Sequence, residues 1–163
     1  KNINILEIGT YEGGCAVYFL KYLRNSKLQV IDTWSKNFQK GTLDENIDFN
    51  YVEKNFDYNI SDFQSRTKKY KGTSEDFFKD NKNKINYFDL IYVDGSHHYQ
   101  DVINDANEAW LTLKNGGIMI FDDFLWDAFG ENSPIRAINE FYQNNKKQMK
   151  LHFIYHQLII EKK

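Results

Sequence analysis

Residues 7–14 read Glu-Ile-Gly-Thr-Tyr-Glu-Gly-Gly and stand between an apolar run at residues 4–8 and a helical pattern at residues 15–24. Glycine adopts a positive φ without steric cost and lets a ligand come close to the backbone. In open α/β sheets, ligands bind beyond the carboxyl ends of the strands, which is where such a turn lies. The stretch therefore predicts a strand, a glycine-rich turn and a helix, with the turn facing a ligand.

The rest of the chain repeats this alternation of strands and helices. Apolar runs predict further strands at residues 28–31, 67–71, 88–93, 118–121, 151–155 and 158–161. Helical spacing and start signals predict helices at residues 43–63, 76–79, 99–113 and 133–147. Asn115-Gly116-Gly117 is expected to separate a helix from the strand that follows. This order predicts an α/β fold, a three-layer, doubly wound, mostly parallel seven-stranded sheet with a C-terminal antiparallel hairpin.

The composition fits one domain and excludes several classes of function. The 163 residues include 41% hydrophobic and 17% aromatic side chains, enough for a sizeable core. The formal net charge is −2, so no excess positive field attracts nucleic acid or anionic lipid. The single cysteine, Cys15, excludes an internal disulfide and a multi-cysteine metal site. We expect one domain over residues 1–163, cut from a longer cytoplasmic protein, with no nucleic-acid or membrane partner.

The spacing of the glycines distinguishes between two kinds of ligand. Dinucleotide-binding turns follow the pattern Gly-x-Gly-x-x-Gly, which brings a helix N-terminus against a pyrophosphate. Here three residues separate Gly9 from Gly13, and Glu12 places a negative charge in the turn. Asp32 ends the next strand, where a carboxylate can accept both hydroxyls of a ribose. The turn favours a nucleoside without phosphates; a nicotinamide-dependent oxidoreductase and a ligand-free turn are the alternatives.

Carboxylates also follow the two clearest apolar strands. Asp94 follows the strand at residues 88–93, and Asp122 and Asp123 follow the strand at residues 118–121. If these strands are neighbours, the three carboxylates lie close together and suit a hard cation such as Mg²⁺, Mn²⁺ or Ca²⁺. His97 lies three residues after Asp94 and can act as a general base near neutral pH. The alternative is that these aspartates are solvated strand ends and that His97 only pairs with one of them.

The glycine-rich turn resembles the first motif of class I S-adenosylmethionine (SAM) dependent methyltransferases, acid-x-Gly-x-x-x-Gly, with Glu7, Gly9 and Gly13 at its positions. Residues 94–99 (Asp-Gly-Ser-His-His-Tyr) and 113–123 (Leu-Lys-Asn-Gly-Gly-Ile-Met-Ile-Phe-Asp-Asp) resemble the metal-assisted branch of small-molecule and sugar O-methyltransferases. The resemblance implies a Rossmann-like methyltransferase fold, with SAM as cofactor and Mg²⁺ as the divalent metal.

The same resemblance implies roles for individual residues. Asp32 is expected to hold the ribose, Trp34 to lie near the adenine, and residues 72–75 to contact the adenine. The full set of expected cofactor-binding residues is Glu7, Gly9, Thr10, Gly13, Asp32, Thr33, Trp34, Ser74, Glu75 and Asp94. The expected metal ligands are Asp94, Asp122 and Asp123, and the expected catalytic residues are His97, as the base, and Asp94.

These observations lead to one hypothesis of function. A methyl group passes from SAM to a hydroxyl of a small polar acceptor, in the first instance a sugar or glycan unit, with help from a metal and His97. Assembly into a homo-oligomer is compatible with this hypothesis. A SAM-fold domain that serves only in protein interaction is the alternative without catalysis.

Overall fold

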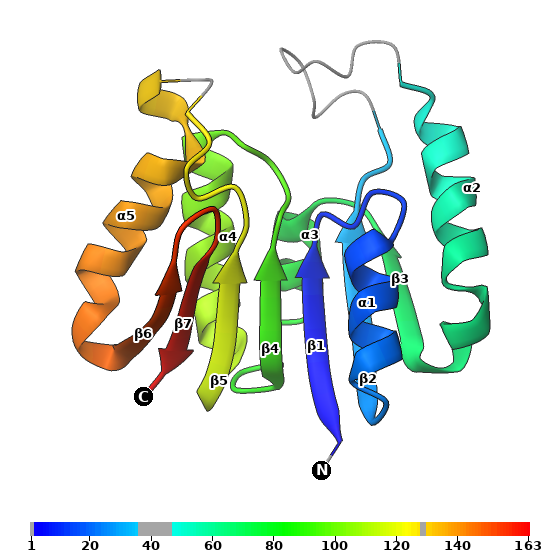
Figure 1. Cartoon of the computed structure of the whole chain (residues 1–163), viewed down its shortest axis with the longest axis horizontal. Coiled ribbons are helices and arrows are strands. Elements are labelled where there is room, and N and C mark those ends of the chain that lie inside the picture. The colour runs from blue at the N-terminus through cyan, green and yellow to red at the C-terminus, as the bar shows by residue number, and fades with distance from the viewer. Residues whose placement is uncertain (1, 36–46, 128–129) are drawn as a thin grey trace.

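The computed structural model describes residues 2–35, 47–127 and 130–163 and shows a central β-sheet with helices on both faces (Figure 1). The strands are β1 (Ile3–Ile8), β2 (Ser26–Asp32), β3 (Thr67–Lys71), β4 (Phe88–Val93), β5 (Leu113–Phe121), β6 (Met149–Ile154) and β7 (Leu158–Lys162). Their order across the sheet is β3-β2-β1-β4-β5-β7-β6. All pairs from β3 to β5 are parallel, whereas β7 runs antiparallel to both β5 and β6. The predicted sheet and its C-terminal hairpin are confirmed.

Helices pack on the two faces of the sheet in separate apolar clusters. They are α1 (Gly14–Tyr22), α2 (Phe49–Asn59), α3 (Ser74–Asp80), α4 (Tyr99–Thr112) and α5 (Pro134–Asn145), with short 3-10 turns η2 (Ser61–Arg66), η3 (Gly130–Asn132) and η4 (Lys146–Gln148). Helices α1 and α2 enclose one cluster, which includes Phe19 and Phe56. Helices α3, α4 and α5 enclose the other, which includes Trp110 and Phe141. The apolar stripe of α4 is thus buried against the sheet, as its helical spacing predicts.

Two elements differ from the prediction by more than two residues at a boundary. The helix expected at residues 43–63 begins at Phe49, becomes a 3-10 turn from Ser61, and has its first four expected residues outside the described ranges. Strand β5 follows α4 directly, because Leu113 is fully buried and pairs with Phe88. The expected glycine turn is instead an irregularity within β5, where the register with β4 shifts and Gly116 has a φ of 75°.

The order of the strands reverses at β1, which pairs with β2 on one side and β4 on the other. Loops that leave β1 and β4 therefore diverge and open a crevice at the carboxyl edge of the sheet. Gly9 stands at this point with a φ of 79°, and a Cβ atom there would lie 1.9 Å from the backbone oxygen of Asp94. Only glycine allows the turn after β1 to touch the end of β4 so closely.

None of the helices in the described parts of the chain is both long enough and apolar enough to cross a membrane.

Candidate functional site

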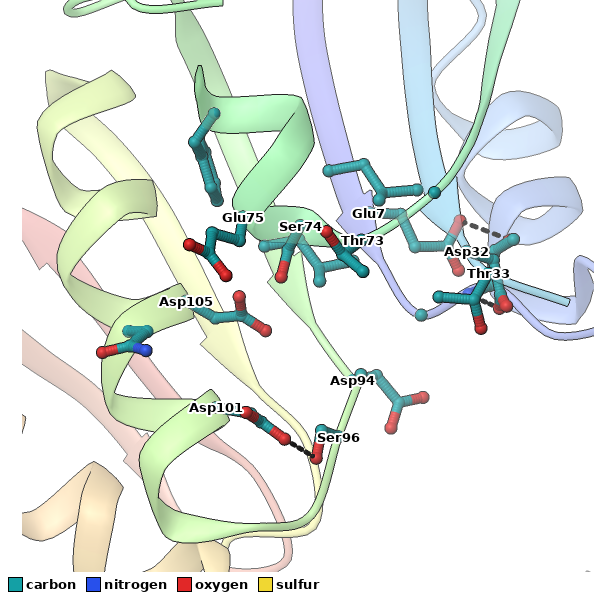
Figure 2. A pocket seen from close by; sticks show the side chains of 18 of the residues that line it. Glu7, Asp32, Thr33, Thr73, Ser74, Glu75, Asp94, Ser96, Asp101 and Asp105 are labelled. Carbon is teal, nitrogen blue, oxygen red and sulfur yellow. Dashed lines mark hydrogen bonds between the residues drawn. The ribbon is translucent and has the colours of Figure 1, made fainter. Parts of the chain in front are cut away.

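A cavity of about 1200 Å³ lies at the carboxyl edge of the sheet, between the loops that follow β1, β2, β3 and β4. Figure 2 shows the carboxyl groups of Glu7, Asp32, Asp94 and Asp105 around it. The residues singled out by the sequence that line this cavity are Glu7, Gly9, Thr10, Asp32, Thr33, Ser74, Glu75, Asp94 and His97. Four loops, distant in sequence, thus bring most of the expected cofactor-binding residues to one space.

Trp34 and Gly13 lie beneath the turn and are not among the residues that line the cavity. The Trp34 side chain is 3% exposed and packs against Phe56, with ring centroids 5.1 Å apart. Its Nε1 donates a hydrogen bond of 2.9 Å to the backbone oxygen of Tyr11. Gly13 has a φ of 82°, and a Cβ there would meet the Phe56 ring at 2.8 Å. Both residues contact the turn on the side away from the cavity. The resemblance had implied that Trp34 lies near the adenine.

The carboxylate of Asp32 holds the backbone of two loops. Its Oδ2 accepts hydrogen bonds from the amides of Thr10, at 3.0 Å, and Tyr11, at 2.9 Å. Its Oδ1 accepts one from the amide of Trp34, at 2.8 Å. A carboxylate has about four acceptor positions, so Asp32 shapes the turn and keeps acceptor capacity on Oδ1 for a ligand hydroxyl.

Glu7 is the most deeply buried acid of the site, with 1% of its surface exposed. Burial, together with the charges of Asp94 and Asp32, raises the pKa of Glu7 from 4.5 to about 8. The Thr10 hydroxyl donates a hydrogen bond of 3.2 Å to Glu7 Oε2, which opposes this shift. The three carboxyl groups therefore repel one another, and a positively charged ligand would relieve that repulsion.

A second group of titratable side chains lies after two neighbouring strands. Asp94 and His97 come from the loop after β4, and Asp123 comes from the loop after β5. One ligand atom from each lies within 4.8 Å of the others, a spacing that a metal ion can bridge. His97 Nε2 lies 2.7 Å from Asp123 Oδ2, and this contact raises the pKa of His97 and lowers that of Asp123. Burial and the neighbouring charges of Asp122 and Asp123 raise the pKa of Asp94 from 3.8 to about 7. The Trp126 ring lies beside the His97 ring, with centroids 4.6 Å apart.

Asp122 forms hydrogen bonds outside this group. The Tyr92 hydroxyl donates a hydrogen bond to Asp122 Oδ2, and the Asp123 amide donates one of 3.0 Å to Oδ1. The backbone at Asp123 has a φ of 51°, so successive carboxylates in this loop diverge. The sequence led us to expect Asp94, Asp122 and Asp123 as one group of metal ligands. In the structure, His97 takes the place of Asp122 in the group with Asp94 and Asp123.

Asp105 is a buried acid of the cavity that was not predicted as a site residue. Asp105 is 5% exposed, and burial raises its pKa from 3.8 to about 7, while a hydrogen bond with Ser74 lowers it. Asp105 lies on α4 within the apolar stripe of Val102, Ala106 and Ala109, which are buried. An acid on the buried face of a helix was the signal in the sequence that could have identified it.

Comparisons with known proteins agree with this geometry. Residues 6–124 match a family described as a methyltransferase domain. The chain is 30% identical over 128 residues to the uncharacterized protein R132 of Acanthamoeba polyphaga mimivirus, a match that covers 76% of this chain and 52% of that protein. The chain therefore spans about half the length of this curated relative.

Solved structures of methyltransferases share the fold. An O-methyltransferase from Bacillus cereus in complex with SAH (S-adenosylhomocysteine) has a TM-score of 0.75 at 18% identity, covering 98% of this chain and 74% of that chain. TomG, an O-methyltransferase from Streptomyces achromogenes in complex with SAM, has a TM-score of 0.73 at 14% identity, with coverages of 98% and 72%. MycE from the mycinamycin pathway, in complex with Mg, SAH and mycinamycin VI, has a TM-score of 0.70 at 15% identity, with coverages of 99% and 45%.

The family match extends from the end of β1 to the loop after β5 and so includes the glycine-rich turn, Asp32, and the group of Asp94, His97 and Asp123. At these identities the solved structures support the Rossmann-like fold alone, and the family match identifies the domain as a methyltransferase domain. The chain belongs to the methyltransferase domain family.

Proposed function

We propose that this domain is a SAM-dependent O-methyltransferase that methylates a hydroxyl of a small polar acceptor, with a sugar or glycan unit as the first candidate. The observation that carries the proposal is that one cavity is lined both by the nucleoside-type turn with Asp32 and by His97, whose Nε2 lies 2.7 Å from Asp123 Oδ2. The Bacillus cereus and Streptomyces achromogenes structures, which contain SAH and SAM, support the cofactor assignment.

The acids of the cavity fit a sulfonium cofactor. Glu7, Asp32 and Asp94 face one another without a lysine or arginine that pairs with any of them in the described residues. A sulfonium brings a positive charge and no phosphate, so these carboxyl groups attract it. Asp32 Oδ1 has capacity to accept a ribose hydroxyl, and Gly9 leaves the backbone of the turn open to close approach.

His97 supplies the base of the proposed reaction. A carboxylate can only accept a hydrogen bond, so Nε2 of His97 is the donor to Asp123. In the neutral ring Nδ1 then carries the lone pair and takes the proton of the acceptor hydroxyl. Asp123 orients the ring and stabilises the imidazolium that forms, which is the usual role of such an acid. In-line methyl transfer depends strongly on this kind of positioning.

The two aspartates of this group, Asp94 and Asp123, also fit a divalent cation while His97 acts as the base. Two clustered carboxylates suit Mg²⁺, and the repulsion that raises the pKa of Asp94 is the cost that a cation would offset. The presence of Mg in the MycE complex supports this assignment. A divalent cation held by Asp94 and Asp123 would lower the pKa of an acceptor hydroxyl.

Calorimetric titration with SAH and with NADH tests the cofactor assignment. We expect heat from SAH and none from NADH; the reverse would support the oxidoreductase, and no heat from either would support an interaction domain. Methyl transfer to a panel of sugars and small phenols, with Mg²⁺ and then with EDTA, tests the acceptor and the metal. Activity that EDTA leaves unchanged would contradict the metal assignment and leave the cofactor assignment in place.

A further inference from the structure

The loop after β5 is held by a buried tyrosine that the proposed methyl transfer does not use. Tyr92 lies on β4, is 7% exposed and is not among the residues that line the cavity. Its hydroxyl donates a hydrogen bond to Asp122 Oδ2 and accepts one of 3.2 Å from Gln157 Nε2. Gln157 belongs to the turn between β6 and β7, so Tyr92 joins the C-terminal hairpin to the loop that carries Asp123.

The direction of each hydrogen bond at Tyr92 follows from the chemistry of its partners. The side-chain nitrogen of Gln157 can only donate, and the carboxylate of Asp122 can only accept. The single hydrogen of the Tyr92 hydroxyl is therefore directed to Asp122. Burial and this hydrogen bond raise the pKa of Tyr92, so the hydroxyl keeps its hydrogen at neutral and moderately alkaline pH.

The backbone of the same loop is held at three successive residues. The amide of Asp122 donates to the backbone oxygen of Val93, at 3.0 Å, and the amide of Asp123 donates to Asp122 Oδ1, also at 3.0 Å. The amide of Phe124 donates to the backbone oxygen of His156, at 2.8 Å, in the turn between β6 and β7. Strand β4 and the C-terminal hairpin therefore fix the course of this loop together.

This support maintains a costly backbone conformation. Asp123 has a φ of 51°, and a residue other than glycine keeps such a conformation only where the surrounding structure holds it. In this conformation Asp123 Oδ2 lies 2.7 Å from His97 Nε2. A change to a negative φ would send the Asp123 side chain in another direction and break this contact. The partner of the proposed base therefore depends on groups that lie outside the cavity.

We propose that Tyr92 and Gln157 are positioning residues that hold the loop after β5 in the conformation in which Asp123 meets His97. The inference rests on the proposed function, in which His97 is the base, and it gives the C-terminal hairpin a part in that reaction. Both residues act through Asp122, and neither is among the residues that line the cavity. Loss of either one should slow methyl transfer without weakening cofactor binding.

Tyr92→Phe tests the inference, because it removes the hydroxyl and keeps the ring that packs against Phe19, with centroids 5.7 Å apart. We expect kcat to fall by about 10–100-fold because the base is misplaced, with SAH affinity and the KM of the acceptor within about twofold of wild type. The rate is measured with the most active acceptor of the sugar and phenol panel, and SAH binding is measured by calorimetry. A residue that only supports the fold would change SAH binding and the melting temperature along with the rate.

Amide hydrogen exchange, measured by NMR on the protein without ligands, follows the loop directly. In Tyr92→Phe we expect the amides of Asp123 and Phe124 to exchange about tenfold faster, as after the loss of one hydrogen bond, while those of β1 and β2 keep their rates. Gln157→Leu removes only the donor to the Tyr92 hydroxyl, so we expect smaller changes, of about threefold, in kcat and in exchange. This second variant decides the question where Tyr92→Phe does not fold.

Tyr70→Phe is the matched control. The Tyr70 hydroxyl donates a hydrogen bond of 2.9 Å to Asp80 Oδ2, between β3 and α3. The variant therefore loses the same kind of contact away from the loop after β5. It is expected to keep the wild-type kcat and the wild-type exchange rate at Asp123.

The outcomes distinguish this inference from the function on which it rests. A folded Tyr92→Phe variant with the wild-type kcat overturns the inference and leaves the proposed function standing, and so does wild-type exchange at Asp123. Loss of SAH binding in parallel with kcat also overturns it, because the tyrosine then supports the whole domain. Wild-type protein that neither binds SAH nor transfers a methyl group contradicts the proposed function, and the inference with it.

Discussion

Two acidic regions at the carboxyl edge of the sheet differ in what their carboxylates already hold. Asp32, at the end of β2, accepts hydrogen bonds from three backbone amides and fixes the glycine-rich turn. Asp94 follows β4 and Asp123 follows β5; among the residues that the structure describes, their side chains share one hydrogen bond, from His97 to Asp123, and keep their other acceptor positions. The same residue type at equivalent strand ends therefore holds the backbone in one place and keeps acceptor positions for a proposed ligand in the other.

The position of an acid in the topology therefore does not by itself decide what the acid does. The role of each acid depends on how many hydrogen bonds its carboxylate already accepts from backbone amides. Variants of the first region are expected to change stability, and variants of the second to change chemistry.

His97→Ala removes the base from the ligand-facing region, and we expect the largest effect here. Loss of a general base lowers kcat by about 10²–10⁴-fold, while SAH affinity and the melting temperature stay close to wild type. The measurement is methyl transfer with an active acceptor, together with SAH titration. His152→Ala is the control, since His152 contacts Glu161 at 2.6 Å outside the cavity and its loss should leave kcat unchanged. Parallel loss of turnover and SAH binding would instead indicate a structural role for His97.

Gly9→Ala disrupts the point where the two regions meet. The new Cβ would lie 1.9 Å from the backbone oxygen of Asp94 in a left-handed conformation, so we expect a loss of about 3 kcal/mol or more in the free energy of unfolding. Gly116→Ala measures the cost of the positive φ alone, because Gly116 also has a positive φ but a Cβ there would have no atom within 4 Å. It should cost about 1 kcal/mol. Denaturant unfolding measures both, and equal losses would contradict the close contact.

Asp32→Asn weakens the acid that shapes the turn. The amide replaces one acceptor with a donor that faces backbone N–H groups, so we expect a loss of about 2 kcal/mol in the free energy of unfolding, and weaker SAH binding. Asp48→Asn is the control, because Asp48 is exposed and accepts from the single amide of Asn50 at the start of α2. If both variants have the same stability, the three hydrogen bonds of Asp32 do not contribute as described.

Glu7→Gln changes the dependence of stability on pH. Because the pKa of Glu7 is about 8 in the folded protein and near 4.5 when exposed, the folded state binds more protons between these values. Stability therefore falls as pH rises through this window, by about 1.4 kcal/mol per pH unit at the steepest.

The test is denaturant unfolding of wild type and Glu7→Gln at pH 6, 7, 8 and 9. Glutamine keeps the hydrogen bond from Thr10 and does not titrate, so the decline between pH 7 and 8 should become markedly smaller. Asp94 and Asp105, whose pKa values are raised to about 7, account for the decline that remains, which is steepest below pH 7. An unchanged slope between pH 7 and 8 would show that Glu7 is already ionised there.

The sequence was sufficient to predict the seven strands and the helices, because continuous apolar runs and helical spacing reflect burial directly. It failed at Asn115-Gly116-Gly117, where glycines usually indicate a turn. The burial of Leu113 against Phe88 extends β5 backwards through those glycines, and such a tertiary contact leaves no local signal.

More of the residues expected to bind the cofactor lie together in the cavity than of the residues expected to hold the metal. Motif spacing brought Glu7, Gly9 and Asp32 together correctly because one turn and one neighbouring strand determine their places. The direction of each side chain in the loop after β5 was beyond the sequence, because it depends on the positive φ at Asp123 and on the hydroxyl of Tyr92. Asp105 was missed because its partner, Ser74, comes from a different βα unit.

The reversal of strand order at β1 has a consequence for how such a domain can diversify. The groups assigned to the nucleoside come mainly from the ends of β1, β2 and β3, whereas Trp126 and Asp123 come from the loop after β5. Under the proposed function, mutations in the loop after β5 can change the acceptor without changing the loops that bind SAM. Selection can then act on the two halves as separate modules, each tied to its own strands.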